Sequence, residues 1–169
     1  MMYVIRTKTG CELSSSNALQ RIGYIIKTPE KLMNIHNKGT WRQQRYLIFT
    51  GYIFLEMDSE LKSQDYYKIK NTDGVINFIG GGNPQTVSEI EKQYINWLWN
   101  EGRPIEPSKI YVTPEGQKLI MSGPLKKYSG SYAEICVRQK RARVFVPICG
   151  RQYRVCLLYT SDAADDRIS

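Results

Sequence analysis

The sequence predicts an α+β fold with two domains, the second of which is a small all-β barrel. Three observations support this division. Strand-like and helix-like patterns alternate over residues 1–101, a segment with two prolines follows over 102–112, and only short strand-like segments occur over 113–157. With 41% hydrophobic and 24% charged residues, the chain has an ordinary globular composition, so both parts have apolar side chains for a core.

The N-terminal domain opens with a strand and a short helix. Residues 3–7 are rich in β-branched and aromatic side chains, which favour a strand. Polar residues 14–17 supply caps for a helix that Gly23 ends. The hydrophilic stretch that reaches residues 37–40 has the composition of a loop or a hairpin tip.

The most strand-like part of the chain is residues 41–57. Its two runs, 46–49 and 52–55, are joined at Gly51 and are apolar on both faces. Strands that are buried on both faces read as continuous apolar runs, so we expect two central strands here.

Two helices and a strand complete this domain. The apolar stripe over residues 58–70 predicts a helix, and residues 74–79 predict a strand that three glycines end. Ser88 followed by Glu91 predicts a capping box, and the helix that it starts ends near Gly102.

The C-terminal part is predicted to be an SH3-like barrel. Its strand-like segments, separated by Gly, Pro and Ser, are 118–121, 132–138, 142–148 and the residues from 153 onward. Val144, Phe145 and Val146 favour strand, and a proline inside a helix costs about 3 kcal/mol. Because Pro147 follows these residues, we expect a barrel here and not a helical hairpin.

The last residues, 158–169, change abruptly to an acidic, small-residue composition without apolar periodicity. From Cys156 to Asp165 the string is like the translation of a sequencing-library adapter, and such segments are set apart from fold prediction. We expect this tail to be either non-native or an ordinary disordered terminus. In the first case the native sequence diverges after about Val155.

Charge is concentrated in the second domain. The chain has a net charge of +8, and residues 113–155 contain nine basic and two acidic residues. This density suits a polyanionic partner such as RNA. A basic surface that serves only solubility is the alternative.

Several classes of function have little support in the sequence. The four cysteines form no C-x-x-C pair and His36 is the single histidine, so we expect no metal centre. No nucleophile, base and orienting group can be assembled, so we expect neither an enzyme nor a cofactor. No apolar run has the length of a membrane span and no signal-peptide pattern opens the chain, so we expect a cytoplasmic monomer.

Short motifs follow one another in an order that is specific as a whole. In the first domain they are Tyr3-Val4, Thr28-Pro29-Glu30, residues 48–55 and residues 74–81, and in the second they are Gly116, Ser122-Gly123-Pro124-Leu125, Gly130 and residues 146–151. Over residues 2–155 they resemble the NusG family of transcription factors. The family usually has Pro-Gly-Tyr where this chain has Thr50-Gly51-Tyr52. The Ser-Gly-Pro-Leu form is more similar to specialised antiterminators of the LoaP and RfaH kind.

The resemblance implies an NGN domain, with an antiparallel sheet flanked by helices, followed by a KOW barrel. It also implies an elongation and antitermination factor that binds across the RNA polymerase clamp and reduces pausing or termination, while the KOW domain recruits RNA or a protein. Residue by residue, it would place Met2, Phe49 and Tyr52 on the clamp helices and Asp65, Tyr66 and Tyr67 opposite the gate loop.

Two of these positions have an alternative. Phe49 and Tyr52 can simply belong to the sheet core. In a strand, however, Phe49 points away from the side of Ile48, and we expect it to be partly exposed on the polymerase-binding face. Tyr66 and Tyr67 are neighbours on a helix and cannot both face one core stripe, so one of them should be exposed.

In the KOW barrel the family often presents an aromatic residue before Gly-Arg to ribosomal protein S10 or to the termination factor Rho. This chain has Cys149 there, so neither contact is carried over. Its cations predict RNA contacts through phosphates instead, at Lys126, Lys127, Arg138, Lys140, Arg141 and Arg143. A solvated turn is the alternative for these residues, and a ribosome-associated KOW-type RNA-binding protein is the alternative for the whole chain.

Overall fold

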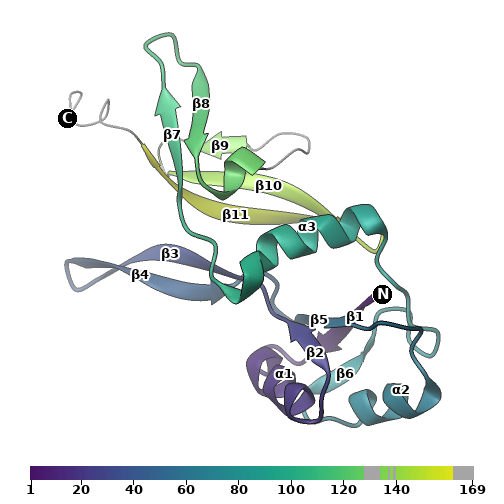
Figure 1. Ribbon diagram of the computed structural model, residues 1–169. Helices are drawn as coiled ribbons and strands as arrows, with labels where there is room; N and C mark the ends of the chain where they lie inside the picture. Colours follow the sequence, from purple (N-terminus) through teal and green to yellow (C-terminus); the bar gives the residue numbers. More distant parts are fainter. Residues whose placement is uncertain (128–133, 137, 139, 162–169) are drawn as a thin grey trace.

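The α+β fold class is confirmed in the computed structural model of the chain, which describes residues 1–127, 134–136, 138 and 140–161. Two domains follow one another along the chain, and an α-helix lies between them in space (Figure 1). Part of the strand expected over 132–138 lies outside the described residues, and so does the tail from residue 162 onward.

The first domain is built on a four-stranded sheet with the order β2-β5-β1-β6. Its members are β1 (Met2–Thr7), β2 (Ile25–Lys27), β5 (Tyr52–Glu56) and β6 (Val75–Phe78). All neighbours are antiparallel, as the family resemblance implies. Three helices accompany the sheet: α1 (Glu12–Arg21), α2 (Ser63–Lys70) and α3 (Glu89–Trp99).

Alternating residues of the central strands pack on opposite faces of this sheet. Tyr3, Ile5, Ile53 and Leu55 pack in one cluster with Leu19 of α1 and Ile69 of α2. Met2, Val4 and Phe54 belong to a second cluster, which includes Ile95 and Leu98 of α3 and continues into the barrel. One face of the sheet therefore carries α1 and α2, and the other carries α3 and the second domain (Figure 1).

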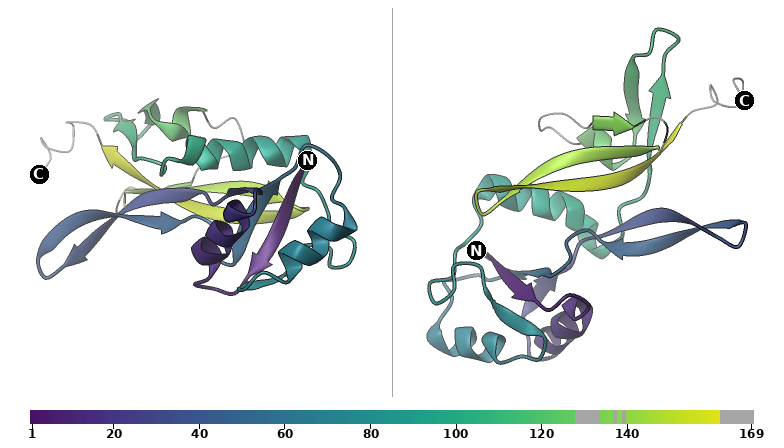
Figure 2. Two further views of the ribbon diagram at one scale, coloured as in Figure 1. Left: turned by 60° about the horizontal axis from the view of Figure 1, so that its bottom comes forward. Right: turned by 180° about the vertical axis from the view of Figure 1, so that it is seen from behind.

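Strands β3 (Glu30–Asn37) and β4 (Thr40–Leu47) form a separate two-stranded hairpin. It extends away from the first sheet, alongside the barrel (Figure 2). The hairpin tip predicted at residues 37–40 is confirmed, because Asn37 pairs with Thr40 across the turn. The prediction that residues 46–49 form a central strand is wrong: β4 ends at Leu47 in the hairpin, and Tyr46 is 40% exposed. Apolar content alone did not distinguish a hairpin end from a buried strand.

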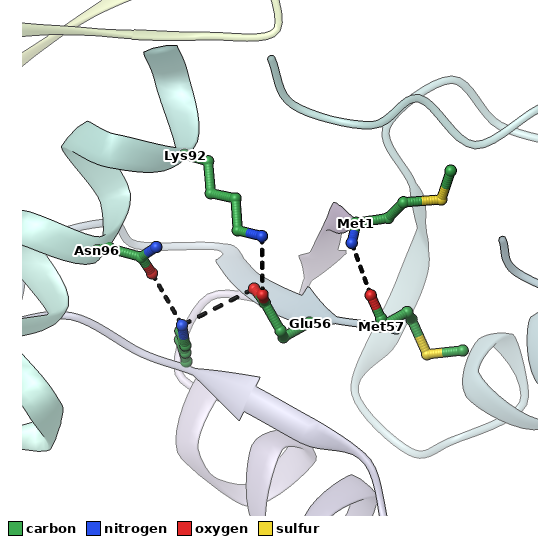
Figure 3. A network of polar contacts seen from close by, with 6 residues as sticks. Met1, Glu56, Met57, Lys92 and Asn96 are labelled. Atoms are coloured by element: carbon green, nitrogen blue, oxygen red, sulfur yellow. Dashed lines mark hydrogen bonds and ion pairs between the residues drawn. The ribbon is translucent and has the colours of Figure 1, made fainter. Parts of the chain in front are cut away.

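Helix α3 begins with a side-chain cap, and polar side chains join it to the sheet. The predicted capping box is confirmed, since the Ser88 hydroxyl accepts from the Glu91 amide and the Glu91 carboxylate accepts from the Ser88 amide. Figure 3 shows Lys92 and Asn96 above Glu56 of β5. Lys92 forms an ion pair of 2.9 Å with Glu56, and the hydrogen bond to this carboxylate raises the pKa of the lysine.

The other two helices begin at positions different from those predicted. Helix α1 begins at Glu12, ahead of the polar residues expected to cap it, and its N-cap, Cys11, makes no side-chain cap. The Glu12 carboxylate instead accepts from the Gly10 amide at 2.6 Å. Helix α2 begins only at Ser63.

The second domain is a curled five-stranded sheet with the order β8-β7-β11-β10-β9. Its strands are β7 (Ser108–Val112), β8 (Lys118–Ser122), β9 (Glu134–Cys136), β10 (Arg141–Ile148) and β11 (Arg151–Ser161). The prediction of strand and not helix over the segment around Pro147 is confirmed, because β10 pairs with β11 along its whole length.

The structure differs from the expected linker over 102–112. Ser108–Val112 is β7, which pairs with both β8 and β11. The preceding residues are also fixed: the Ile105 amide donates to the Glu30 carbonyl, and the Leu32 amide donates to the Ile105 carbonyl. Two prolines were compatible with an extended segment paired to its neighbours as well as with a free linker.

The expected disorder of the tail from residue 158 is also not what the described part shows. Strand β11 continues to Ser161, and Leu158 and Tyr159 are buried. The reason is that Leu157, Leu158 and Tyr159 form an apolar run that can pack.

Candidate functional site

The predicted aromatic patch lies on the sheet face that the barrel covers. Met2 and Phe49 are 1% and 5% exposed, and Tyr52 is half-buried. All three residues belong to or pack on the same core cluster, so the structure brings them together. The expectation that Phe49 is partly exposed is wrong for this arrangement, because a barrel residue, Tyr153, lies against it.

Tyr153, at the beginning of β11, is the centre of this contact. Its ring packs edge-on against Phe49 and Tyr52, with ring centroids 6.0 and 5.9 Å apart. Phe49 in turn packs edge-on against Phe54 at 5.2 Å. Burial and a hydrogen bond with Tyr52 raise the pKa of Tyr153 to about 12, so its hydroxyl is neutral at physiological pH. We call Met2, Phe49 and Tyr52 the aromatic face.

Glu91 and Trp97 of α3 make polar contacts with the barrel. The Glu91 carboxylate that caps α3 also accepts a hydrogen bond of 3.2 Å from the Gly150 amide. The Trp97 indole donates to the Pro124 carbonyl at 3.0 Å. Burial raises the pKa of the Cys149 thiol next to Gly150, and the charge of Glu91 raises it further. The barrel is therefore held against the first domain by the shared apolar cluster, by the aromatic packing of Tyr153 and by these polar contacts.

The second predicted group lies on α2, and its Tyr66 packs on the other core cluster. Tyr66 stacks on Phe78, with centroids 5.5 Å apart, while Tyr67 is 60% exposed. Tyr67 is thus the exposed neighbour that the sequence required. Asp65 accepts a hydrogen bond of 2.7 Å from the Tyr24 hydroxyl, and burial together with this carboxylate raises the pKa of Tyr24 to about 12.

Tyr66 and Tyr67 also line an open cavity of about 380 Å³ next to the Gly82–Pro84 turn. Every described residue of its lining belongs to the first domain. The structure therefore separates the two predicted groups: the aromatic face is covered by the barrel, and the exposed side of α2 is open.

The predicted basic residues do not all lie together. Arg138, Lys140 and Arg141 are exposed around the turn before β10 and line one cavity. Arg143 is half-buried on β10, and Lys126 lies apart on the short 3₁₀ helix Pro124–Lys127. The side chain of Lys127 is outside the described residues.

Sequence reasoning missed two residues of these surfaces. Tyr153 gave no signal, because an aromatic residue in a short strand is ordinary. Trp41, which lines the cavity of the basic turn, did give one: it is a tryptophan within the hydrophilic stretch from Asn37 to Gln44. No helix in the described part of the chain has the length and apolarity to cross a membrane.

Comparison with known proteins places these features in a family context. Residues 2–96 match the family model described as transcription termination factor nusG. The chain is 25% identical to the "Transcription termination/antitermination protein NusG" of Helicobacter pylori J99, over 94% of each chain. It is 30% identical to the protein of that name from Chlamydia trachomatis, over 79% of this chain and 72% of the relative. The Thermus thermophilus protein of that name is 24% identical, over 89% and 90%.

Proposed function

Because the chain belongs to the NusG family, we propose that it binds RNA polymerase through the aromatic face and bridges the polymerase cleft through α2. As a member of this family it is a transcription elongation and antitermination factor, which acts with RNA polymerase. The clamp helices and the gate loop are the proposed contacts of the first domain. The barrel is proposed to recruit RNA or a protein.

The apolar character of the aromatic face supports the first contact. Apolar patches larger than those of an ordinary surface mark protein interfaces, and aromatic side chains contribute strongly to binding. Met2, Phe49 and Tyr52 would form such a patch if the barrel moved away, since Tyr153 covers them in this arrangement. Polymerase and barrel would therefore compete for one face.

This competition makes barrel release a step of the proposed mechanism. A chain that is mostly closed binds polymerase with an affinity lowered by the fraction that is open. Polymerase binding to the open form then shifts the population toward it. A factor that is bound to polymerase and contacts both sides of the cleft favours the closed clamp over the open one. In this way it would reduce pausing without a chemical step.

The exposed side of α2 supplies the test of the bridging contact. Tyr67→Ala is expected to abolish most of the pause suppression while polymerase affinity changes only about threefold, because the aromatic face is intact and an exposed residue contributes little to folding. The lifetime of a defined pause, measured with purified polymerase and the full chain, reads this out. Ile22→Ala, a change at another exposed apolar residue, is the matched control. Normal pause suppression by Tyr67→Ala would exclude α2 as the second contact.

The basic turn is proposed to bind RNA through phosphates. Changing Arg138, Lys140, Arg141 and Arg143 together to Ser should weaken RNA binding. It should also make the plot of log affinity against log salt concentration less steep, by about 0.7 for each phosphate that the variant no longer neutralises. A filter-binding titration at several salt concentrations measures both quantities. The control changes four exposed cations of the first domain to Ser: Lys8, Arg21, Lys62 and Lys68. Equally weakened binding by both variants would leave only a nonspecific effect of net charge.

A ribosome-associated role is not favoured. The family match covers the N-terminal domain, which a KOW barrel of a ribosomal protein would not explain. Affinity purification of the full chain from its native cells distinguishes the two: recovery with polymerase subunits supports the proposal, and recovery only with ribosomal subunits contradicts it.

A further inference from the structure

An open cavity of about 500 Å³ lies between the hairpin β3–β4 and the barrel. Asn34 and Trp41 line it from the hairpin, and Arg138, Lys140 and Arg141 line it from the barrel. Leu158 completes the lining, but the aromatic, amide and cationic groups all precede Cys156. The hairpin lies beside β10 and β11 in both views of Figure 2, and the Lys31 ammonium donates to the Cys156 carbonyl at 2.8 Å.

Trp41 is held in place and yet exposed. Its indole stacks on the His36 ring across the hairpin, with centroids 4.8 Å apart and an angle of 28° between the planes. The side chain remains 68% exposed, the largest fraction among the big apolar side chains in the described part of the chain. A fixed, exposed indole is a platform on which another flat ring can stack.

The charged side chains described around this platform are positive. Among the described residues that line the cavity, none is acidic. The hairpin from Lys31 to Tyr46 carries four basic residues and no acidic one, and Glu30 at its base is paired with Arg45 at 2.9 Å. A ligand with flat rings and a repeating negative charge fits both the Trp41 side and the cationic side of this cavity.

We propose that this cavity binds single-stranded RNA, with one unpaired base on Trp41 and the adjoining phosphates on Arg138, Lys140 and Arg141. The inference rests on the proposed RNA contact of the basic turn and extends it to the hairpin of the first domain. A duplex does not fit, because its bases already stack on one another and offer no free face. The Asn34 amide, which can donate and accept, suits a ribose 2′-hydroxyl or a base edge.

Binding of the full chain to a labelled single-stranded RNA of mixed sequence tests the proposal. Trp41→Ala should weaken binding about tenfold or more, since stacking contributes strongly for each base. Trp41→Phe retains a ring and should bind RNA within about threefold of the original chain. RNA should quench the fluorescence of Trp41 in the original chain, and this quenching should disappear in Trp41→Phe. Tyr46→Ala is the matched control, because Tyr46 is an exposed aromatic residue on the same strand that does not line the cavity.

The same titrations distinguish failure of this inference from failure of the proposed function. If Arg138→Ser with Arg141→Ser weakens binding but Trp41→Ala does not, the basic turn binds RNA without the hairpin, and the composite site is wrong. If the original chain binds no RNA, the proposed RNA contact itself fails. Equal or tighter binding of a fully paired RNA, or tighter binding of the same sequence as DNA, overturns the assignment to single-stranded RNA.

Discussion

Replacing Tyr153 by alanine is expected to tighten the binding of RNA polymerase about tenfold or more. The ring of Tyr153 contacts both Phe49 and Tyr52, and these are the aromatic contacts of the barrel with the proposed docking face in the described part of the chain. Each aromatic pair contributes about 0.5–1.5 kcal/mol beyond the area that it buries. Removing both pairs should open the barrel and raise the fraction of chains that polymerase can bind.

The measurement is an equilibrium titration of purified polymerase with the full chain. Tyr111→Ala is the control, because Tyr111 lies on β7 of the same barrel and is not part of the core shared with the first domain. A thermal melt of both variants shows whether the barrel itself remains folded. If Tyr153→Ala binds polymerase no better than Tyr111→Ala, the barrel does not control access to the aromatic face.

Replacing Phe49 by alanine is expected to weaken polymerase binding about thirtyfold, since a central interface aromatic commonly contributes 2 kcal/mol or more. This variant also removes the Phe49 contact with Tyr153, so its barrel should open as well. Phe49→Ala leaves the Tyr52–Tyr153 pair in place, so it should weaken closure less than Tyr153→Ala does, and the two changes should have opposite effects on polymerase binding. Stability should fall too, because truncating a buried phenylalanine costs about 3–5 kcal/mol.

Leu19→Ala separates these two consequences of the Phe49 change. Leu19 is fully buried in the cluster under α1, on the opposite face of the sheet, and its truncation costs about 2–5 kcal/mol. It should lower the melting temperature comparably while folded molecules bind polymerase normally. A Phe49→Ala variant that behaves like Leu19→Ala in both measurements would assign Phe49 to the core and remove it from the docking face.

Local patterns in the sequence were sufficient for much of the first domain. The capping box of Ser88 and Glu91 is a contact between residues three apart, and the continuous apolar run of β5 fits a strand that is buried on both faces of the sheet. The polar tip between Asn37 and Thr40 is local as well. Each of these features depends on neighbours in the chain, so the sequence alone contains the signal.

Contacts between distant residues could not be predicted in this way. The burial of Phe49 depends on Tyr153, which belongs to the other domain, and nothing near either residue signals the pairing. The exposure of Tyr46 depends on the hairpin leaving the sheet. For the candidate RNA cavity, the sequence indicated the cations of the basic turn but not that Trp41 would lie opposite them.

The position of the barrel when polymerase is bound tests the proposed docking face most directly. The labels are two fluorophores, attached to Lys68→Cys on α2 and to Gln117→Cys before β8, which are both exposed positions. The four cysteines of the chain are replaced first, so that only these two positions are labelled. Energy transfer between the fluorophores then reports the separation of the domains. The chain without its four cysteines must first match the original chain in polymerase affinity. Saturating polymerase should lower the transfer, because it displaces the barrel from the aromatic face. Transfer that stays unchanged with polymerase fully bound would mean that the barrel remains seated on Phe49, and the proposed docking face would be wrong.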